Sequence, residues 1–166
     1  MTYLLDSNVF IEAENRCYGL DFCPAFWDWL KLQNRTGKVA SVAAVAEELR
    51  AGRDELKTWA RERGKTFFLE PDGLVLTAMP KVSDWVVKNY ERAAVSDFLS
   101  VADSWLVAHA LAHKHIVVTH ERPANTRRKV KIPNVCKYFN INCTGPYEML
   151  RREGANFILG PSRKTQ

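Results

Sequence analysis

The segment from Asp97 to Thr119 limits the fold of this chain more than any other stretch. It begins with a broad apolar helical pattern over 97–113, and a β-branched run, Ile116 to Thr119, follows almost at once. A helix that leads directly into a short apolar strand is half of a βαβ unit, in which strands run parallel and helices cover the sheet. The sequence therefore predicts an α/β fold, a three-layer α/β/α sandwich with a central parallel β-sheet. We expect Asp97 to be the N-cap of the long helix.

The remaining elements are expected to be short. With 166 residues and 46% hydrophobic residues, the chain can bury one core, so we expect a single domain over 1–160 and a C-terminal tail over 161–166. Helical spacing of Phe26, Trp27 and Leu30 favours core packing over an interface. Strands are expected at 2–6, 38–42, 66–69 and 131–136, and helices at 43–50, 54–63 and 146–152, with a less regular helical pattern at 71–94.

Charge and hydropathy narrow the range of functions. The formal charge is +5 and the sequence pI is about 9.1, which favours an anionic partner. Asp6 and Glu12 interrupt the first apolar stretch, so it does not fit a signal peptide, and no apolar run reaches the roughly 18 to 20 residues that span a bilayer. We therefore expect a cytoplasmic protein without a membrane segment. The four cysteines form no C-x-x-C pair and are expected to be buried free thiols.

Four acidic residues follow or flank the predicted strands. Asp6 ends the first strand, Glu121 follows the strand at 116–119, Asp103 lies near a helix N-terminus, and Glu48 lies on the helix after the second strand. Strand carboxyl ends and the helix N-termini that follow them share one edge of a doubly wound sheet. Clustered carboxylates repel one another unless cations neutralise them, and hard oxygen ligands suit Mg²⁺ or Mn²⁺. Such ions activate water for attack on a phosphodiester, which is nuclease chemistry.

Four stretches resemble PIN-domain proteins across about the whole chain: LLDSNVFI at 4–11, VAEELRAG at 45–52, VADSWLVAHA at 101–110 and VVTHE at 117–121. The likeness is to the prokaryotic branch that includes toxins of toxin–antitoxin pairs. It implies a PIN-like fold and an Mg²⁺- or Mn²⁺-dependent endoribonuclease in which Asp6, Glu48 and Asp103 are metal ligands. Glu121 takes the fourth place, where the family more often has Asp, so its longer side chain shifts it toward water-mediated contact. The resemblance further implies 5′-phosphate and 3′-hydroxyl products, an antitoxin partner and frequently a homodimer.

Several assignments stay open. Glu47 competes with Glu48 for the second acid, and Glu48 is preferred because Leu49 follows it as in the family's E-L pair. The resemblance suggests that Ser7, Asn8 and Thr119 orient ligands or water, but structural capping explains them equally well. The competing function is a PIN-like module that docks RNA or protein with little or no catalysis.

A basic loop follows the last strand of this unit. It spans His120 to Lys131 and is expected to be mobile without its partner. Its position next to the acids would let it hold the phosphates of RNA through contacts that do not depend on sequence. The candidate RNA-binding residues are Arg122, Arg127, Arg128, Lys129 and Lys131. His120 is more simply explained as a loop histidine than as a phosphate contact.

Overall fold

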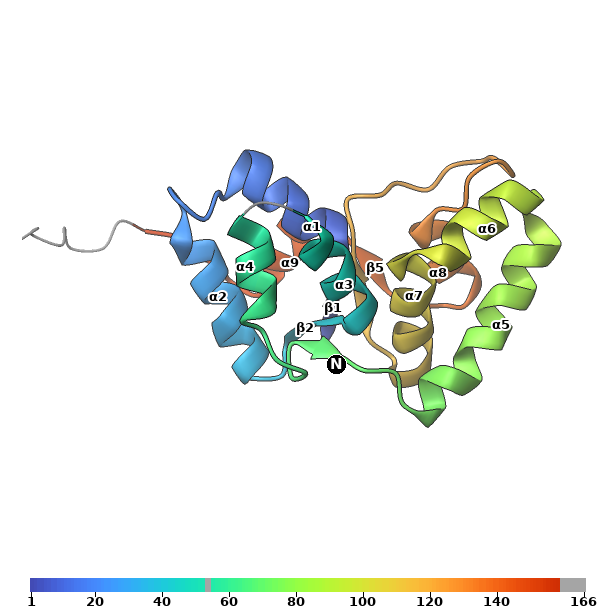
Figure 1. The fold of residues 1–166 in the computed structure, drawn as a ribbon, viewed down its shortest axis with the longest axis horizontal. Coiled ribbons are helices and arrows are strands. Elements are labelled where there is room, and N and C mark those ends of the chain that lie inside the picture. Colours follow the sequence, from blue (N-terminus) through green and yellow to red (C-terminus); the bar gives the residue numbers. More distant parts are fainter. Residues whose placement is uncertain (53–54, 159–166) are drawn as a thin grey trace, which may run out of the picture.

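The computed structural model describes residues 1–52 and 55–158, and within these ranges five parallel strands form one sheet in the order β3-β2-β1-β4-β5 (Figure 1). The central strand β1 pairs with β2 on one side and β4 on the other. The predicted α/β/α sandwich with a parallel sheet is therefore confirmed. The strands are β1 (Tyr3–Leu5), β2 (Val39–Val42), β3 (Phe68–Leu69), β4 (Ile116–Val118) and β5 (Cys143–Thr144).

Helices cover the sheet because its strands are apolar on both faces. β1 and β2 are buried at every position, which is the pattern of a sheet with two covered sides. Helix α7 packs on β2 and β4, α3 on β2 and β3, α2 on β2, and α8 on β5. The helices are α1 (Ser7–Glu12) with its π-helical continuation η1 (Ala13–Cys17), α2 (Pro24–Arg35), α3 (Ala43–Ala51), α4 (Glu55–Arg61), α5 (Gly73–Asn89), α6 (Arg92–Ser100), α7 (Ala102–His113), α8 (Ile132–Tyr138) and α9 (Pro146–Arg152).

The register between β1 and β4 places the carboxyl ends of these two strands side by side. Leu5 pairs with Val118, and the amide of Asp6 donates a hydrogen bond to the carbonyl of Val118 over 3.0 Å. The residues that follow these two strands therefore leave the sheet at the same edge. α3 starts at Ala43, directly after β2, so its first turn also begins at this edge.

The aromatic segment at the start of α2 belongs to the core. Phe26, Trp27 and Leu30 are buried, as the helical spacing predicts. Phe26 stacks on Tyr18 with ring centroids 4.5 Å apart, and Trp27 Nε1 donates to the Tyr18 carbonyl over 2.6 Å. Burying each such side chain contributes about 1.5 to 3 kcal/mol to folding.

The expected long helix at 97–113 is wrong in its first part. α6 ends at Ser100, and α7 begins at Ala102 after Val101, which is extended at φ −116° and ψ 178°. Asp97 therefore lies inside α6 and is not an N-cap. The break persists because a side chain from another helix, Glu48, accepts the hydrogen bond of the Ala102 amide.

The expected strand at 131–136 is also wrong, because the segment forms α8. Pro133 lies in the first turn, where its missing N–H costs no helical hydrogen bond. The buried residues Ile132, Val135 and Cys136 recur at three- and four-residue spacing, so they form one helix face. The strand that completes this edge of the sheet is β5, two residues long, which the sequence pattern did not reveal.

The cysteines are less buried than expected. Cys136 is buried, whereas Cys17 and Cys23 are half-buried and Cys143 is exposed, and all four are free thiols. Among the described residues, no helix is both long and apolar enough to cross a membrane. The expected tail at 161–166 and the helix start at Asp54 lie outside the described residues.

Candidate active site

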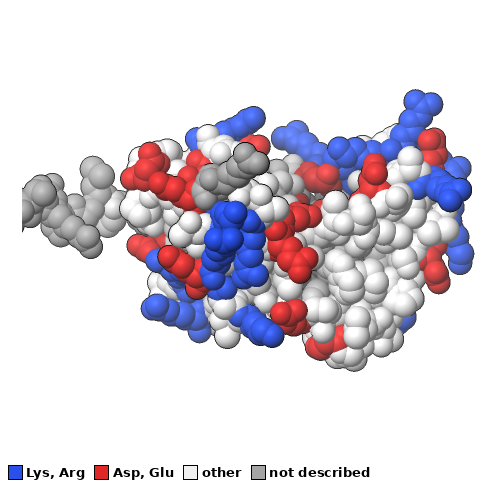
Figure 2. Space-filling view, viewed as in Figure 1, with Lys and Arg blue, Asp and Glu red and all other residues white. Residues whose placement is uncertain are grey.

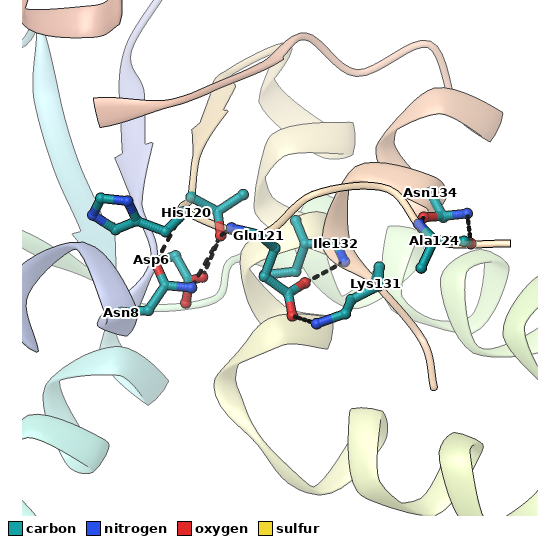
Figure 3. Close-up of polar contacts among 9 residues, drawn as sticks. Asp6, Asn8, His120, Glu121, Ala124, Lys131, Ile132 and Asn134 are labelled. Atoms are coloured by element: carbon teal, nitrogen blue, oxygen red, sulfur yellow. Dashed lines mark hydrogen bonds and ion pairs between the residues drawn. The ribbon is translucent and has the colours of Figure 1, made fainter. Parts of the chain in front are cut away.

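Asp6 is the buried acid of the site. It follows β1, it is 2% exposed, and its Oδ2 accepts a 2.7 Å hydrogen bond from the Thr119 hydroxyl (Figure 3). The Ser7 hydroxyl reaches Oδ1 at a longer 3.4 Å. Burial raises the pKa of Asp6 to about 6, against the lowering effect of the Thr119 hydrogen bond. Asp6 is therefore a carboxylate that is costly to charge unless a cation joins it.

The Thr119 hydroxyl connects three segments. While it donates to Asp6, it accepts hydrogen bonds from Asn8 Nδ2 at 3.1 Å and from the amide of Glu121 at 3.0 Å. Asn8 Oδ1 in turn accepts the amide of His120 at 3.2 Å (Figure 3). The N-cap position of α1 is Asp6, so neither Ser7 nor Asn8 occupies it. Asn8 and Thr119 instead hold the start of α1 against the loop after β4.

Glu48 reaches the same edge from α3. Its Oε1 accepts the amide of Ala102 at 2.8 Å, which joins α3 to the first residue of α7. Asp103 is the next residue of α7, so this bond also positions Asp103 beside Glu48. Glu47 is exposed. Of the two candidates for the second acid, Glu48 is thus the one that faces the other carboxylates.

The negative charges of the other three acids all affect the pKa of Asp103. Its pKa is raised to about 7, first by burial and then by the negative charges of Asp6, Glu121 and Glu48. Only Lys131 acts in the opposite direction among the named charges. The four predicted acids are therefore close enough to interact electrostatically, and their negative charge is only partly compensated.

Glu121 has a close donor on each of its carboxylate oxygens, whereas Asp6 has one close donor, Thr119, and a longer contact from Ser7. Oε1 forms an ion pair with Lys131 Nζ at 2.6 Å, and Oε2 accepts the amide of Ile132 at 2.8 Å (Figure 3). The sequence assigned Lys131 to RNA contact and carried no signal for this pairing, since the two residues lie ten positions apart in a loop. Here Lys131 faces the acids.

The donor set fits a hard divalent cation at part of the site. Asp6 and Asp103 supply oxygen ligands whose pKa values are raised by burial and neighbouring charge, and a cation relieves both effects. Yet within residues 1–52 and 55–158, no three Asp, Glu, His or Cys side chains come together closely enough to form a ready metal site. Glu121 does not fit as a free ligand, because Lys131 and Ile132 already satisfy it.

Two cavities flank Glu121. One, of about 360 Å³, is lined by Asp103 and Glu121 together with Arg128 and Lys129 of the basic loop. The other, of about 630 Å³, runs past His120 toward β5 and includes Arg122 and Tyr147, of which the sequence did not single out the tyrosine. His120 packs edge-on against Tyr147 with ring centroids 5.8 Å apart, and burial lowers its pKa. Glu121 therefore borders both cavities and Asp103 borders one, and basic side chains line each cavity.

The basic loop forms hydrogen bonds with the rest of the chain at several points, and its mobility without a partner stays a prediction. The Glu91 amide donates to the Arg127 carbonyl at 2.9 Å, and Arg127 Nε donates to the Asn89 carbonyl at 3.1 Å. Asn134 exchanges two hydrogen bonds with the backbone of Ala124. Arg122, Arg127, Arg128 and Lys129 are exposed. Figure 2 shows basic side chains gathered along the edge where this loop and α6 lie in Figure 1.

The fold and the acidic edge together define the class of this protein. An all-parallel sheet in the order β3-β2-β1-β4-β5, with acids gathered at the carboxyl ends of β1 and β4, is a PIN-like α/β/α fold. The chain belongs to the family described as Domain of unknown function (DUF4411), which matches residues 3–157.

A solved structure supports the fold. A chain of the crystal structure of VapBC2 from Rickettsia felis bound to a DNA fragment from their promoter is similar to this chain, with a TM-score of 0.53 and 14% identity. The similarity covers 87% of this chain and 98% of that chain. No curated protein sequence matches. At this identity the likeness establishes the shared fold alone.

Proposed function

We propose that this chain is an endoribonuclease that depends on Mg²⁺ or Mn²⁺. The observation that carries the proposal is the gathering of four acids at one edge of the sheet: Asp6 follows β1, Glu48 binds the amide next to Asp103, and Asp103 and Glu121 line one cavity. A protein that only needed stability would gain nothing from placing these carboxylates together, because their repulsion costs free energy in the absence of a cation.

In this proposal two acids hold the ion and a third positions one of them. Asp6 and Asp103 hold the ion, and Thr119 fixes the orientation of Asp6 through the 2.7 Å hydrogen bond. Glu48 holds the first turn of α7, and with it Asp103, through the Ala102 amide. When bound, the divalent ion activates water and stabilises charge on the leaving oxygen of a phosphodiester.

The basic loop supports a nucleic-acid substrate. Arg128 and Lys129 line the cavity that contains Asp103 and Glu121, and Arg122 lines the neighbouring one. A phosphate backbone that crosses the acids would meet cations on both sides, which offsets the repulsion between substrate and carboxylates. We assign RNA as the substrate from the resemblance to PIN-domain ribonucleases.

The biological setting follows from the same likeness. The resemblance to PIN-type toxins, together with a fold shared with a chain of the VapBC2 structure, supports a toxin of the cytoplasm that is controlled by an antitoxin protein. Co-purification with the product of an adjacent gene, and growth arrest on expression of the chain alone, test this part of the proposal.

The direct test is RNA cleavage by the purified chain with Mg²⁺ or Mn²⁺, with EDTA, and with Asp6→Asn. We expect discrete products that require the metal and disappear in Asp6→Asn, with 5′-phosphate and 3′-hydroxyl ends. Asp84→Asn is the matched control, because Asp84 is an exposed carboxylate on α5, and it should cleave like the wild type.

Three results would contradict the proposal. Cleavage that persists in EDTA, or products with 2′,3′-cyclic phosphate ends, would exclude metal-dependent hydrolysis. RNA that stays intact under every condition while the chain still binds it would favour the docking module instead.

A further inference from the structure

The ion pair between Lys131 and Glu121 distinguishes this acidic site from a set of four free metal ligands. Lys131 Nζ lies 2.6 Å from Oε1 of Glu121, and the Ile132 amide lies 2.8 Å from Oε2. Both donors come from the residues at which the basic loop ends and α8 begins. Glu121 is thus satisfied on both oxygens by one short segment of the chain.

Burial makes this pair hard to displace. The side chains of Lys131 and Glu121 are 21% and 16% exposed, so solvent and salt screen their attraction weakly. An ion that binds Glu121 must remove Lys131 from it and leave a mostly buried ammonium without a partner. Exposed lysines such as Lys129 carry no such cost.

Lys131 also acts on a second acid, Asp103. Its positive charge opposes the effect that Asp6, Glu121 and Glu48 have on Asp103. Its ammonium therefore compensates charge on the Glu121 side of the cluster, which is the side away from Asp6 and its bond to Thr119 (Figure 3). A second divalent ion at that position would likewise compensate the negative charge of the acids.

We infer that the ammonium of Lys131 occupies the position beside Glu121 that a second metal ion would otherwise take. The site then binds a single divalent ion, held by Asp6 and Asp103. Glu121 is a positioning residue that does not bind this ion. This inference rests on the proposed function. Lys131 provides a positive charge that does not exchange with solution, and Glu121 fixes it through the contact at 2.6 Å. The pair also anchors the end of the basic loop beside the acids.

The test is Mn²⁺ binding to the full chain, with free Mn²⁺ measured by electron paramagnetic resonance. We expect one Mn²⁺ per wild-type chain, a Kd weaker by about tenfold or more for Asp103→Asn, and a clearly smaller loss for Glu121→Gln, which removes a neighbouring charge and not a ligand. Lys131→Met should free Glu121 and either add a second Mn²⁺ or tighten the first, because a positive charge is removed from beside the ion. Lys131→Arg keeps the charge and should bind one Mn²⁺ with a Kd near that of the wild type.

Lys88→Met is the matched control, because Lys88 is an exposed lysine on α5 that lines neither cavity beside Glu121. It should leave both stoichiometry and Kd unchanged. Thermal melts in EDTA establish that each variant is folded, and if Lys131→Met does not fold, Glu121→Gln and Lys131→Arg still decide the question.

Two Mn²⁺ ions in the wild type, or a Glu121→Gln that weakens binding as much as Asp103→Asn, would overturn the assignment of Lys131. RNA cleavage by the same samples reports on the proposed function separately. Mn²⁺-dependent cleavage by a chain that binds two ions would refute only the role of Lys131, and a chain that binds no Mn²⁺ would refute both.

Discussion

The hydroxyl of Thr119 donates a 2.7 Å hydrogen bond to Oδ2 of Asp6, which lies 113 positions earlier in the chain. The bond crosses from the end of β4 to the end of β1, two strands that pair side by side. It ties the most buried acid of the candidate site to the loop that carries Glu121, because the same hydroxyl accepts the Glu121 amide. Sheet pairing and site geometry therefore depend on one another.

Replacement of Thr119 by Val tests this link. The change removes the hydrogen bond to a buried carboxylate at nearly constant shape, so we expect the metal-free protein to lose about 1 to 3 kcal/mol of unfolding free energy. The pKa of Asp6 should rise further, because the hydrogen bond that lowers it is gone. Urea unfolding in EDTA measures the first effect. Thr77→Val, at an exposed position of α5, is the control and should change little.

Glu48 should stabilise the fold through the hydrogen bond that its carboxylate accepts, in addition to the effect of its charge on the site. Glu48→Ala leaves the Ala102 amide without its partner, and we expect a loss of about 1 to 2 kcal/mol. Glu48→Gln retains an oxygen acceptor and removes a repelling charge, so it should preserve stability. Glu47→Ala alters the exposed neighbour and should have almost no effect. Equal losses in Glu47→Ala and Glu48→Ala would show that the contact to α7 contributes nothing.

The raised pKa values of two acids predict how stability depends on pH. The pKa is about 6 for Asp6 and about 7 for Asp103, above the ordinary value near 4 for an aspartate in an unfolded chain. Between these values the folded state binds more protons than the unfolded state, so both groups favour folding at low pH. Their contribution should be lost as pH rises from about 4 to 7 in the metal-free protein.

Asparagine variants isolate this effect. His109 changes stability in the opposite direction. Burial lowers its pKa to about 4, so the folded state favours its neutral form, and stability should rise with pH as His109 loses its proton in the unfolded chain. We therefore compare Asp103→Asn with the wild type at each pH by chemical unfolding in EDTA. The variant should gain stability relative to the wild type as pH rises toward 7. A constant difference across this range would contradict the raised pKa of Asp103.

The exposed cations of the basic loop should set the salt dependence of RNA binding. Arg122 and Lys129 border the two cavities beside Glu121. Replacing both by Ala should weaken binding of single-stranded RNA. A plot of the logarithm of the association constant against the logarithm of the salt concentration should also become less steep, by about 0.7 for each phosphate that is no longer neutralised. Fluorescence anisotropy with Asp6→Asn as the background avoids cleavage. Lys81→Ala on α5 should leave the slope unchanged, and an unchanged slope in the double variant would remove the loop from the RNA interface.

Local sequence patterns predict the short buried strands and the buried face of α2. The apolar runs that form β1, β2 and β4 are short and bounded by polar residues, and the helical spacing of Phe26, Trp27 and Leu30 predicts their burial. The helix break at Val101 has no local signal, since its cap comes from Glu48, 54 positions before the Ala102 amide. The β-branched residues at 131–136 fit a strand as well as a helix, and the buried face at helical spacing decides for α8.

The sequence by itself determined the parallel α/β fold and indicated that Asp6, Asp103 and Glu121 lie at its edge, because strand ends in such a fold share one edge wherever the chain pairs them. It left Glu47 and Glu48 as alternatives for the other acid. Only the tertiary structure decided what each acid contacts. Asp6 received the Thr119 hydroxyl, Glu48 the Ala102 amide and Glu121 the ammonium of Lys131. Those partners depend on the register of β1 against β4 and on the path of the loop into α8, and both are set by packing rather than by any local pattern of residues.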